Sequence, residues 1–288
     1  MSEGSGLVVV DKQAGVTSHD VVARVRRLAG TRKVGHAGTL DPMATGVLVL
    51  GINRATRLLG HLTLTEKAYD ATIRLGASTT TDDSEGEIVS TAPTDGLDEP
   101  RIRAALARFR GGIEQVPNAV SAIKVDGRRA YRRVRDGEDV QLAARPVTVH
   151  ELEMHAVRAG GEGIDVDVSL RCSSGTYVRA IARDLGVELG VGGHLVALRR
   201  TSVGPFGLDR AHTLEQLAQE FTMVPIAEAA RASFPSRDLG AAQAGDVRHG
   251  RQIDADLAGL TALFAPDGEF LALYEPTHGT TRAVAVFV

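Results

Sequence analysis

Two stretches of the chain alternate between apolar and polar residues. Every second residue is apolar in residues 164–172 (IDVDVSLRC), and residues 68–75 place Tyr69, Ala71 and Ile73 on one face. This period of two is typical of strands that are buried on one face, as in antiparallel sheets, whereas parallel sheets need continuous apolar runs. Helical patterns lie between the strands. The sequence therefore predicts an α+β fold, with a mixed, largely antiparallel sheet flanked by helices.

The expected helices have recognisable ends. Thr17 and Ser18 are good caps for a helix that follows them, and Gly30 is a suitable stop. Residues 178–185 also have helical spacing, and Gly186 is expected to end that helix. Both segments would pack one apolar face against the sheet.

The C-terminal part differs in character from the rest. After residue 235, three short apolar runs are separated by Pro-Asp-Gly and His-Gly turn signals. This pattern predicts a small β-rich domain over residues 236–288, which follows a large domain over residues 1–232.

Composition excludes several classes of protein. The formal net charge is −3, so the overall basic excess that is common in nucleic-acid-binding proteins is missing. Cys172 is the single cysteine, which rules out an intramolecular disulfide and a cysteine-based zinc site and fits a reducing cytosol. No signal peptide and no apolar stretch of membrane-spanning length is evident. We therefore expect a cytoplasmic protein with no membrane partner.

Two candidate metal sites are weak. His150 and His155 resemble a zincin pair, but their spacing is one residue too long for a shared helical face, and the preceding PVTV favours a strand. Asp82, Asp83 and Glu85 lack the spacing of a calcium loop, so a solvated loop is favoured. The chain also lacks a Walker loop, a dinucleotide fingerprint and a Gly-x-Ser-x-Gly elbow. We expect neither a metal nor an organic cofactor.

One glycine-rich segment, GHAGTLDPMATGVL, holds a single carboxylate, that of Asp41. It belongs to residues 31–46, which we expect to form a loop. The small residues around Asp41 permit tight turns and close approach by a ligand, and Pro42 stiffens the backbone beside it. A rigid loop that offers one acidic group to a large ligand is one interpretation. An ordinary Asp-Pro turn is the other, and the residues alone do not decide between them.

The same segment resembles the catalytic motif of the TruB-type tRNA pseudouridine synthases, which modify uridine 55 in the T-loop. Other segments resemble that family in the same order: LVVVDKQAGVTSHD, EKAYDATIRLG, IEQVPNAVSAIKVDGRRAY, ARPVTV, CSSGTYVRAIARDLG and GGHLVALRR. The resemblance covers roughly residues 6–215. It implies the pseudouridine synthase catalytic fold for the large domain. The small domain resembles a reduced PUA-like RNA-binding domain.

The resemblance also implies an isomerisation in which a uridine is flipped out of the RNA. Asp41 would be the nucleophile, Tyr69 would stack on the uracil, and Arg179 would pair with Asp41. The alternatives without a catalytic role are a core aromatic for Tyr69 and a surface position for Arg179. Asp83 aligns with an acidic position of the family, although its neighbours differ from the family pattern.

Further pocket residues are implied in the same way. His36 would help to hold the flipped base, Tyr177 and Leu198 would line the pocket, and Lys12 would support it. Residues that line a pocket are hard to distinguish from core residues by sequence.

A basic run, KVDGRRAYRRVR, stands out in this acidic chain. Such runs are often only solvated, but this one is dense and contains Tyr131. We expect it to contact RNA phosphates through these side chains: Lys124, Arg128, Arg129, Arg132 and Arg133.

The expected substrate is therefore the T-arm of tRNA, bound by a monomer. Two other functions remain open. One is a pseudouridine synthase that acts on another RNA, and the other is a non-catalytic RNA-binding or RNA-chaperone protein.

Overall fold

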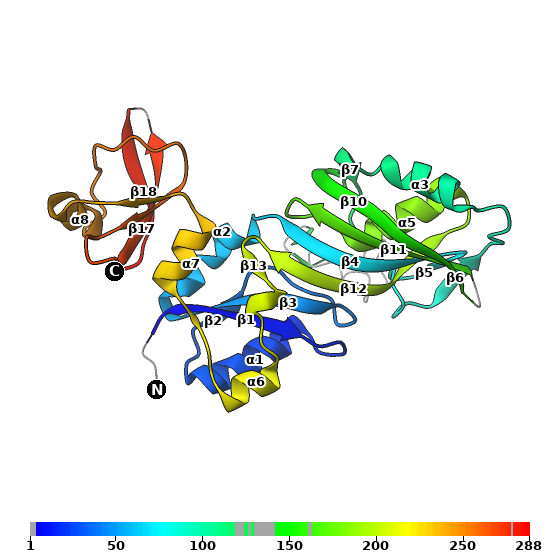
Figure 1. The fold of residues 1–288 in the computed structure, drawn as a ribbon, viewed down its shortest axis with the longest axis horizontal. Coiled ribbons are helices and arrows are strands. Elements are labelled where there is room, and N and C mark those ends of the chain that lie inside the picture. The colour runs from blue at the N-terminus through cyan, green and yellow to red at the C-terminus, as the bar shows by residue number, and fades with distance from the viewer. Residues whose placement is uncertain (1–3, 119–123, 126–127, 130–141, 161–162, 278) are drawn as a thin grey trace. The chain divides into compact units, whose positions relative to one another are not determined.

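The computed structural model describes residues 4–118, 124–125, 128–129, 142–160, 163–277 and 279–288. The chain forms two compact units. Unit 1 consists of Met1–Asp41, Gly46–Thr63 and Val203–Val288, and unit 2 consists of Pro42–Thr45 and Leu64–Ser202. Both units combine strands with helices (Figure 1), so the predicted α+β class is confirmed.

The first part of unit 1 is a small antiparallel sheet. Strand β1 (Gly6–Lys12) pairs with β3 (Thr45–Ile52) and with β14 (Val224–Pro225), and β2 (Val34–His36) pairs with the other edge of β3. The helices of this part are α1 (Ser18–Ala29), α2 (Leu59–Thr63), α6 (Leu214–Gln219) and α7 (Ile226–Ser233), with short 3₁₀ turns at Asn53–Arg57 and Leu208–Arg210. Helix α6 lies beside α1 (Figure 1).

Helix α1 follows its sequence signals closely. Thr17 is its N-cap, with a capping box to Asp20, and Gly30 ends it in the left-handed conformation at φ 65°. Val21 and Val25 are fully buried, so the apolar face packs on the core. Strand β2 was not foreseen, because its three residues are held by their pairing with β3 rather than by an apolar pattern of their own.

The C-terminal part of unit 1 is a four-stranded sheet in the order β15-β16-β17-β18: Ser236–Asp238, Thr261–Phe264, Phe270–Thr277 and Thr280–Val286. Helix α8 (Ala241–Arg248) packs against it. The β-rich character predicted for this part is confirmed. Phe264, Phe270 and Phe287 share one buried cluster with Leu7 and Val47, so this sheet and the β1–β3 sheet bury their apolar faces together. The predicted domain limits at 232 and 236 fall in the last turn of α7 and at the first residue of β15, and they stay a prediction.

Unit 2 is dominated by long antiparallel strands, in the order β12-β4-β11-β10-β7: Gly193–Val203, Lys67–Leu75, Gly163–Cys172, Arg145–Gly160 and Gly111–Gln115. Two small pairs accompany them, β5 (Ala77–Thr79) with β6 (Ile88–Thr91), and β8 (Lys124–Val125) with β9 (Arg128–Arg129). Helices α3 (Glu99–Ala107) and α5 (Val178–Leu189) contact each other. A two-residue strand, β13 (Phe206–Gly207), follows β12 in the chain.

Helix α5 does not end at Gly186, as the sequence predicted. It continues to Leu189 and ends at Gly190, which has φ 76°. Gly186 serves a different purpose: a Cβ there would lie 2.1 Å from the amide nitrogen of Gly193, which is closer than any side chain tolerates. The glycine permits the helix to approach the backbone that leads into β12. Among the helices of the described ranges, none has the length and apolar character needed to cross a membrane.

Candidate active site

The loop that carries Asp41 is anchored at both ends by strands. Strand β2 ends at His36, and Ala37 continues the pairing by donating its amide to Val49 of β3 at 2.9 Å. Gly38 and Gly46 have φ values of 98° and 97°, which residues with a side chain rarely adopt. Asp41 is half-buried between these fixed points. The two strands and the two glycines therefore fix the ends of the loop that carries Asp41, and the role of Asp41 as nucleophile stays a prediction.

Tyr69 lies on β4 and is only 7% exposed. The strand alternates as predicted, so Tyr69 shares the buried face with Lys67 and Ala71 and lies opposite Leu170 of β11. Burial alone fits a core aromatic as well as a stacking residue, so the proposed role of Tyr69 stays a prediction.

Arg179 lies in the first turn of α5 and is buried, not on the surface. Its Nη1 donates a hydrogen bond to the carbonyl oxygen of Thr81 at 2.9 Å and lies 3.3 Å from Oδ2 of Asp83. Within unit 2, Asp83 is therefore an ion-pair partner of Arg179. Asp41 is the last residue of a unit 1 segment, and the predicted pair between Asp41 and Arg179 stays a prediction.

Asp83 is held by its own loop. Its Oδ1 accepts hydrogen bonds from Thr81 Oγ1 at 2.5 Å and from the amide of Glu85 at 3.1 Å. The Asp83 carbonyl accepts a bond from Thr79 Oγ1 at 2.8 Å. Contacts within its own loop thus fix the Asp83 carboxylate independently of Arg179. Sequence analysis did not find this pair.

Asp82, next to Asp83, belongs to a second buried contact. Asn118 donates its amide to Asp82, and Arg183 lies 3.5 Å from the same carboxylate. Burial raises the pKa of Asp82, although the Asn118 hydrogen bond and the Arg183 charge oppose that shift. Asp82 and Asp83 are therefore packed against α5 rather than solvated, whereas Glu85 is exposed as expected.

Tyr177 is placed by a single amide side chain. Gln115, 2% exposed, donates to the Tyr177 carbonyl at 3.1 Å and accepts from the Tyr177 amide at 2.7 Å. Tyr177 is also the N-cap residue of α5. The Gln115 side chain therefore binds both the amide and the carbonyl of Tyr177. These two bonds fix the start of the helix that carries Arg179.

Leu198 of β12 lines a cavity of about 440 Å³ in unit 2. Met43 and Thr45, which follow Asp41 in the chain, line the same cavity, together with Asp70 and Arg199. Arg199 Nη1 lies 3.4 Å from Thr45 Oγ1. A volume of this size falls in the range of small-ligand pockets.

Lys12 and His36 complete the residues that sequence analysis singled out in unit 1. Lys12 is fully buried, and its Nζ donates to the carbonyls of Gln13 at 3.0 Å and Val16 at 2.8 Å, which ties the turn before α1. The His36 ring meets His19 edge to face, with centroids 5.9 Å apart. The roles expected of Lys12 and His36 stay predictions.

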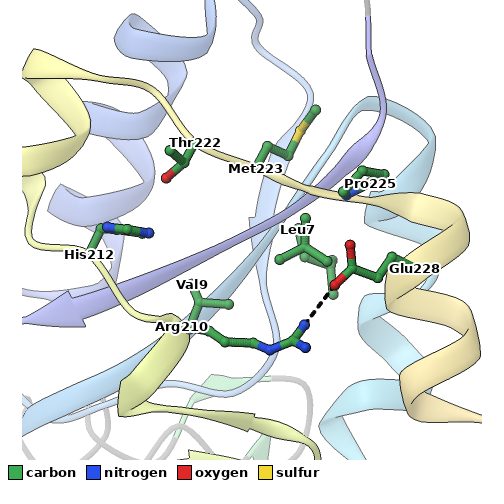
Figure 2. Close-up of a pocket in the computed structure, with 9 residues that line it drawn as sticks. Leu7, Val9, Arg210, His212, Thr222, Met223, Pro225 and Glu228 are labelled. Atoms are coloured by element: carbon green, nitrogen blue, oxygen red, sulfur yellow. Dashed lines mark hydrogen bonds and ion pairs between the residues drawn. The ribbon is translucent and has the colours of Figure 1, made fainter.

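Unit 1 has a cavity of its own, of about 290 Å³ (Figure 2). Arg210 reaches across it to Glu228, with Nη1 and Oε1 2.9 Å apart. His212 and the buried strand residues Leu7 and Val9 also line it. It contains none of the residues that sequence analysis selected.

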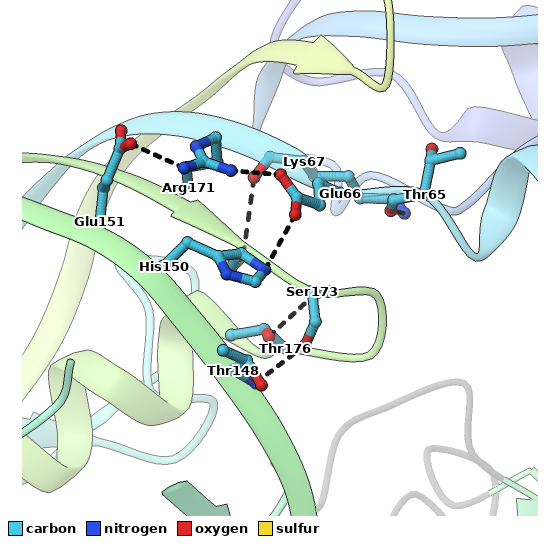
Figure 3. Close-up of polar contacts among 10 residues, drawn as sticks. Thr65, Glu66, Lys67, Thr148, His150, Glu151, Arg171, Ser173 and Thr176 are labelled. Atoms are coloured by element: carbon cyan, nitrogen blue, oxygen red, sulfur yellow. Dashed lines mark hydrogen bonds and ion pairs between the residues drawn. The ribbon is translucent and has the colours of Figure 1, made fainter. Parts of the chain in front are cut away.

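The two histidines weighed as zinc ligands lie on strand β10, as the strand interpretation predicted. His150 Nε2 lies 3.1 Å from Glu66, which also pairs with Arg171 (Figure 3). His155 instead shares a 2.7 Å hydrogen bond with Ser169 Oγ. In the part of the chain that the structure describes, no group of three or more His, Cys, Asp or Glu residues is placed to hold a metal.

The basic run falls largely outside the described residues. Arg132 and Arg133 lie there, and for the other three residues only the β8–β9 backbone pairing is described: Lys124, Arg128 and Arg129. Their proposed contact with RNA stays a prediction.

Three family models match the chain in succession. "TruB family pseudouridylate synthase (N terminal domain)" matches residues 26–178, "tRNA pseudouridylate synthase B C-terminal domain" matches residues 179–230, and "tRNA Pseudouridine synthase II, C terminal" matches residues 234–288.

Similar proteins match along almost the whole length. A protein of Arthrobacter sp. (strain FB24) named tRNA pseudouridine synthase B is 59% identical, over 98% of this chain and 96% of its own. A protein of the same name from Thermobifida fusca (strain YX) is also 59% identical, over 98% of both chains.

Among solved structures, a chain in the crystal structure of a Cbf5–Nop10–Gar1 complex has a TM-score of 0.77 at 26% identity, covering 98% of this chain and 85% of that one. A chain in the structure of an H/ACA RNP bound to a substrate RNA has a TM-score of 0.74 at 25% identity.

The chain has the fold of a pseudouridine synthase, an enzyme of the isomerase class. Within that class, the chain belongs to the TruB family of pseudouridylate synthases.

Proposed function

We propose that this enzyme converts uridine 55 in the T-loop of tRNA to pseudouridine, with Asp41 as the nucleophile. The observation that carries the proposal is the near-full-length similarity to proteins named tRNA pseudouridine synthase B. Two rigid strands also frame the loop in which Asp41 is the one carboxylate. The reaction takes place in the cytoplasm, and a monomer binds the T-arm.

The reaction exchanges one glycosidic bond for another. The bond from uracil N1 to ribose C1′ breaks, a bond from C5 to C1′ forms, C5 loses a proton, and N1 carries one in the product. Substrate and product are isomers, so no oxidant, reductant or energy source enters this balance. Asp41 acts at the sugar either by attack on C1′ or by assisting elimination, and both require the carboxylate to be ionised.

The other residues of the proposed site bind and orient the base. Extrusion of the uridine costs a few kcal/mol, about the strength of one good stacking contact on an aromatic ring such as that of Tyr69. Arg179 pairs with Asp41 and orients its carboxylate, because a planar guanidinium can donate two parallel hydrogen bonds to a carboxylate. His36 helps to hold the flipped base, Tyr177 and Leu198 line the pocket, and Lys12 supports it.

Binding of the tRNA is spread over many more groups. The basic run of residues 124–135 contacts phosphates, and the C-terminal sheet adds RNA-binding surface. Loss of one catalytic side chain should therefore leave affinity intact.

The test is release of tritium from tRNA transcripts labelled at uracil C5. Wild type should release one tritium per transcript, and a transcript with cytidine at position 55 should release none. Asp41→Asn should bind the tRNA with unchanged affinity and release none. Asp95→Asn, a change of an exposed loop carboxylate, is the matched control and should be fully active. Substantial turnover by Asp41→Asn would overturn the assignment. Inactivity of the wild type with tight binding would favour an RNA chaperone.

A further inference from the structure

The backbone next to Asp41 is held by the hydroxyl of one buried serine. Ser18 Oγ donates a hydrogen bond to the carbonyl oxygen of Leu40 at 3.0 Å and accepts one from the amide of Leu40 at 2.9 Å. Ser18 is 1% exposed and Leu40 is 4% exposed. The carbonyl that accepts the bond belongs to the peptide that joins Leu40 to Asp41. Because a peptide group is planar, fixing that carbonyl also fixes the direction in which the Asp41 backbone begins.

Ser18 is itself immobile, because it is the first residue of α1. Thr17 caps this helix: its hydroxyl accepts a hydrogen bond from the amide of Asp20 at 3.1 Å. In turn, the Asp20 carboxylate accepts one from the amide of Thr17 at 3.0 Å. Val21, in the next turn, is fully buried. The hydroxyl of a serine at a helix start normally accepts a hydrogen bond from an amide of the first helical turn. Here the hydroxyl of Thr17 accepts that bond, so the Ser18 hydroxyl is available to bind the loop.

We propose that Ser18 is a positioning residue, whose hydroxyl sets the direction in which the Asp41 carboxylate enters the active site. The inference rests on the proposed function, in which Asp41 is the nucleophile. A loop made largely of small residues has few side chains with which to fix its backbone. A displacement of the reacting group by about 1 Å can cost roughly a hundredfold in rate.

We call this arrangement a clasp: one hydroxyl donates to the carbonyl and accepts from the amide of the same residue. The chain contains a matched control for it. Thr281 Oγ1 donates to the carbonyl of Ile253 at 2.8 Å and accepts from the amide of Ile253 at 3.2 Å. Thr281 is fully buried and Ile253 is 4% exposed. The two clasps share their chemistry and burial, but Thr281 holds the C-terminal sheet region rather than the loop of Asp41. Thr281→Val therefore reports the structural cost of losing such a clasp.

The experiment compares Ser18→Ala with Thr281→Val. Single-turnover rates are measured with enzyme in excess and saturating, alongside the tRNA dissociation constant and the thermal unfolding midpoint. We expect Ser18→Ala to lower the single-turnover rate by about tenfold to a hundredfold. The dissociation constant should stay within about twofold, because binding is spread over many contacts. Thr281→Val should lose a comparable amount of thermal stability and keep the wild-type rate.

Ser18→Cys covers the case in which Ser18→Ala does not fold. Its thiol is somewhat larger than the hydroxyl, so it leaves no void, but it is a weak donor and acceptor. This variant should therefore fold and lose rate by about tenfold or more. A folded Ser18 variant that reacts at the wild-type rate overturns the inference. Asp41→Asn separates the two proposals. If it is active, the proposed function fails, whereas an inactive Asp41→Asn beside a fully active Ser18→Ala defeats only the role of Ser18.

Discussion

Asp83 and Arg179 form an ion pair inside unit 2, with Oδ2 and Nη1 3.3 Å apart and side chains that are 3% and 7% exposed. The pair joins the loop after β5 to the first turn of α5. Removing one partner of a buried pair is much more costly than removing one partner of an exposed pair, because the remaining charge has lost both water and its counter-charge.

The first prediction follows from this burial. Asp83→Asn should lower the free energy of unfolding by about 3 kcal/mol or more. Glu99→Gln removes a carboxylate from an ion pair with Arg103 whose side chains are 58% and 55% exposed, and it should change stability by less than about 1 kcal/mol. Urea unfolding of both variants measures the difference. Equal effects would show that the buried pair contributes no more than a surface contact.

The second prediction concerns the shape of the guanidinium. Arg179→Lys should fold, bind tRNA and lose most of its turnover, since an ammonium cannot reproduce a planar fork directed at several acceptors. Arg179→Ala should lose more. Arg183→Lys, one turn further along α5, is the control and should keep its rate. The assay is the single-turnover rate beside tRNA affinity. An Arg179→Lys enzyme with wild-type turnover would remove Arg179 from the proposed site.

The sequence predicted the elements whose signals are local. Alternation placed Tyr69 correctly on the buried face of β4, because a strand repeats every two residues. The cap at Thr17 and the stop at Gly30 placed α1, because both act through backbone geometry within a few residues. The apolar runs after residue 235 likewise predicted the β-rich C-terminal part.

The contacts that hold the candidate site could not be predicted in this way. Gln115 clasps Tyr177 from 62 residues away, and Arg179 reaches Thr81 across 98 residues. A pattern of neighbouring residues cannot predict contacts between side chains that are so far apart in the sequence. Gly186 was wrongly predicted to end a helix for the same reason, because its role is close packing against Gly193. The resemblance supplied the candidate residues, and the structure supplied the partners of Arg179 and Tyr177.

A third prediction tests the basic run. Changing its four arginines to Gln should weaken tRNA binding and lower the slope of log affinity against log salt by roughly one unit per lost phosphate contact: Arg128, Arg129, Arg132 and Arg133. A charge-matched control changes four arginines that form ion pairs with carboxylates in the structure: Arg103, Arg108, Arg158 and Arg210. The control should keep most of the slope. Identical slopes for wild type and the first variant would show that the run is only a solvated surface.

The last prediction is a pH dependence set by Lys67, which lies on the same face of β4 as Tyr69 and is 7% exposed. Burial, and then the charge of Arg200, lower the pKa of Lys67 from 10.5 to about 8. Between these two pH values the unfolded chain binds more protons than the folded one, so the stability contributed by Lys67 rises with pH. Cys172, which lies opposite Lys67 on β11, has its pKa raised by burial from 9.0 to about 11, so its own contribution to stability falls as the pH rises above 9. That contribution is present in both the wild type and Lys67→Met, so the comparison of the two isolates Lys67. The free energy of unfolding of the wild type relative to Lys67→Met should therefore increase from pH 7.5 to pH 9.5. The same comparison with Lys33→Met, at an exposed position, should be flat. A wild type that loses stability relative to Lys67→Met over this range would contradict the lowered pKa of Lys67 in the folded protein.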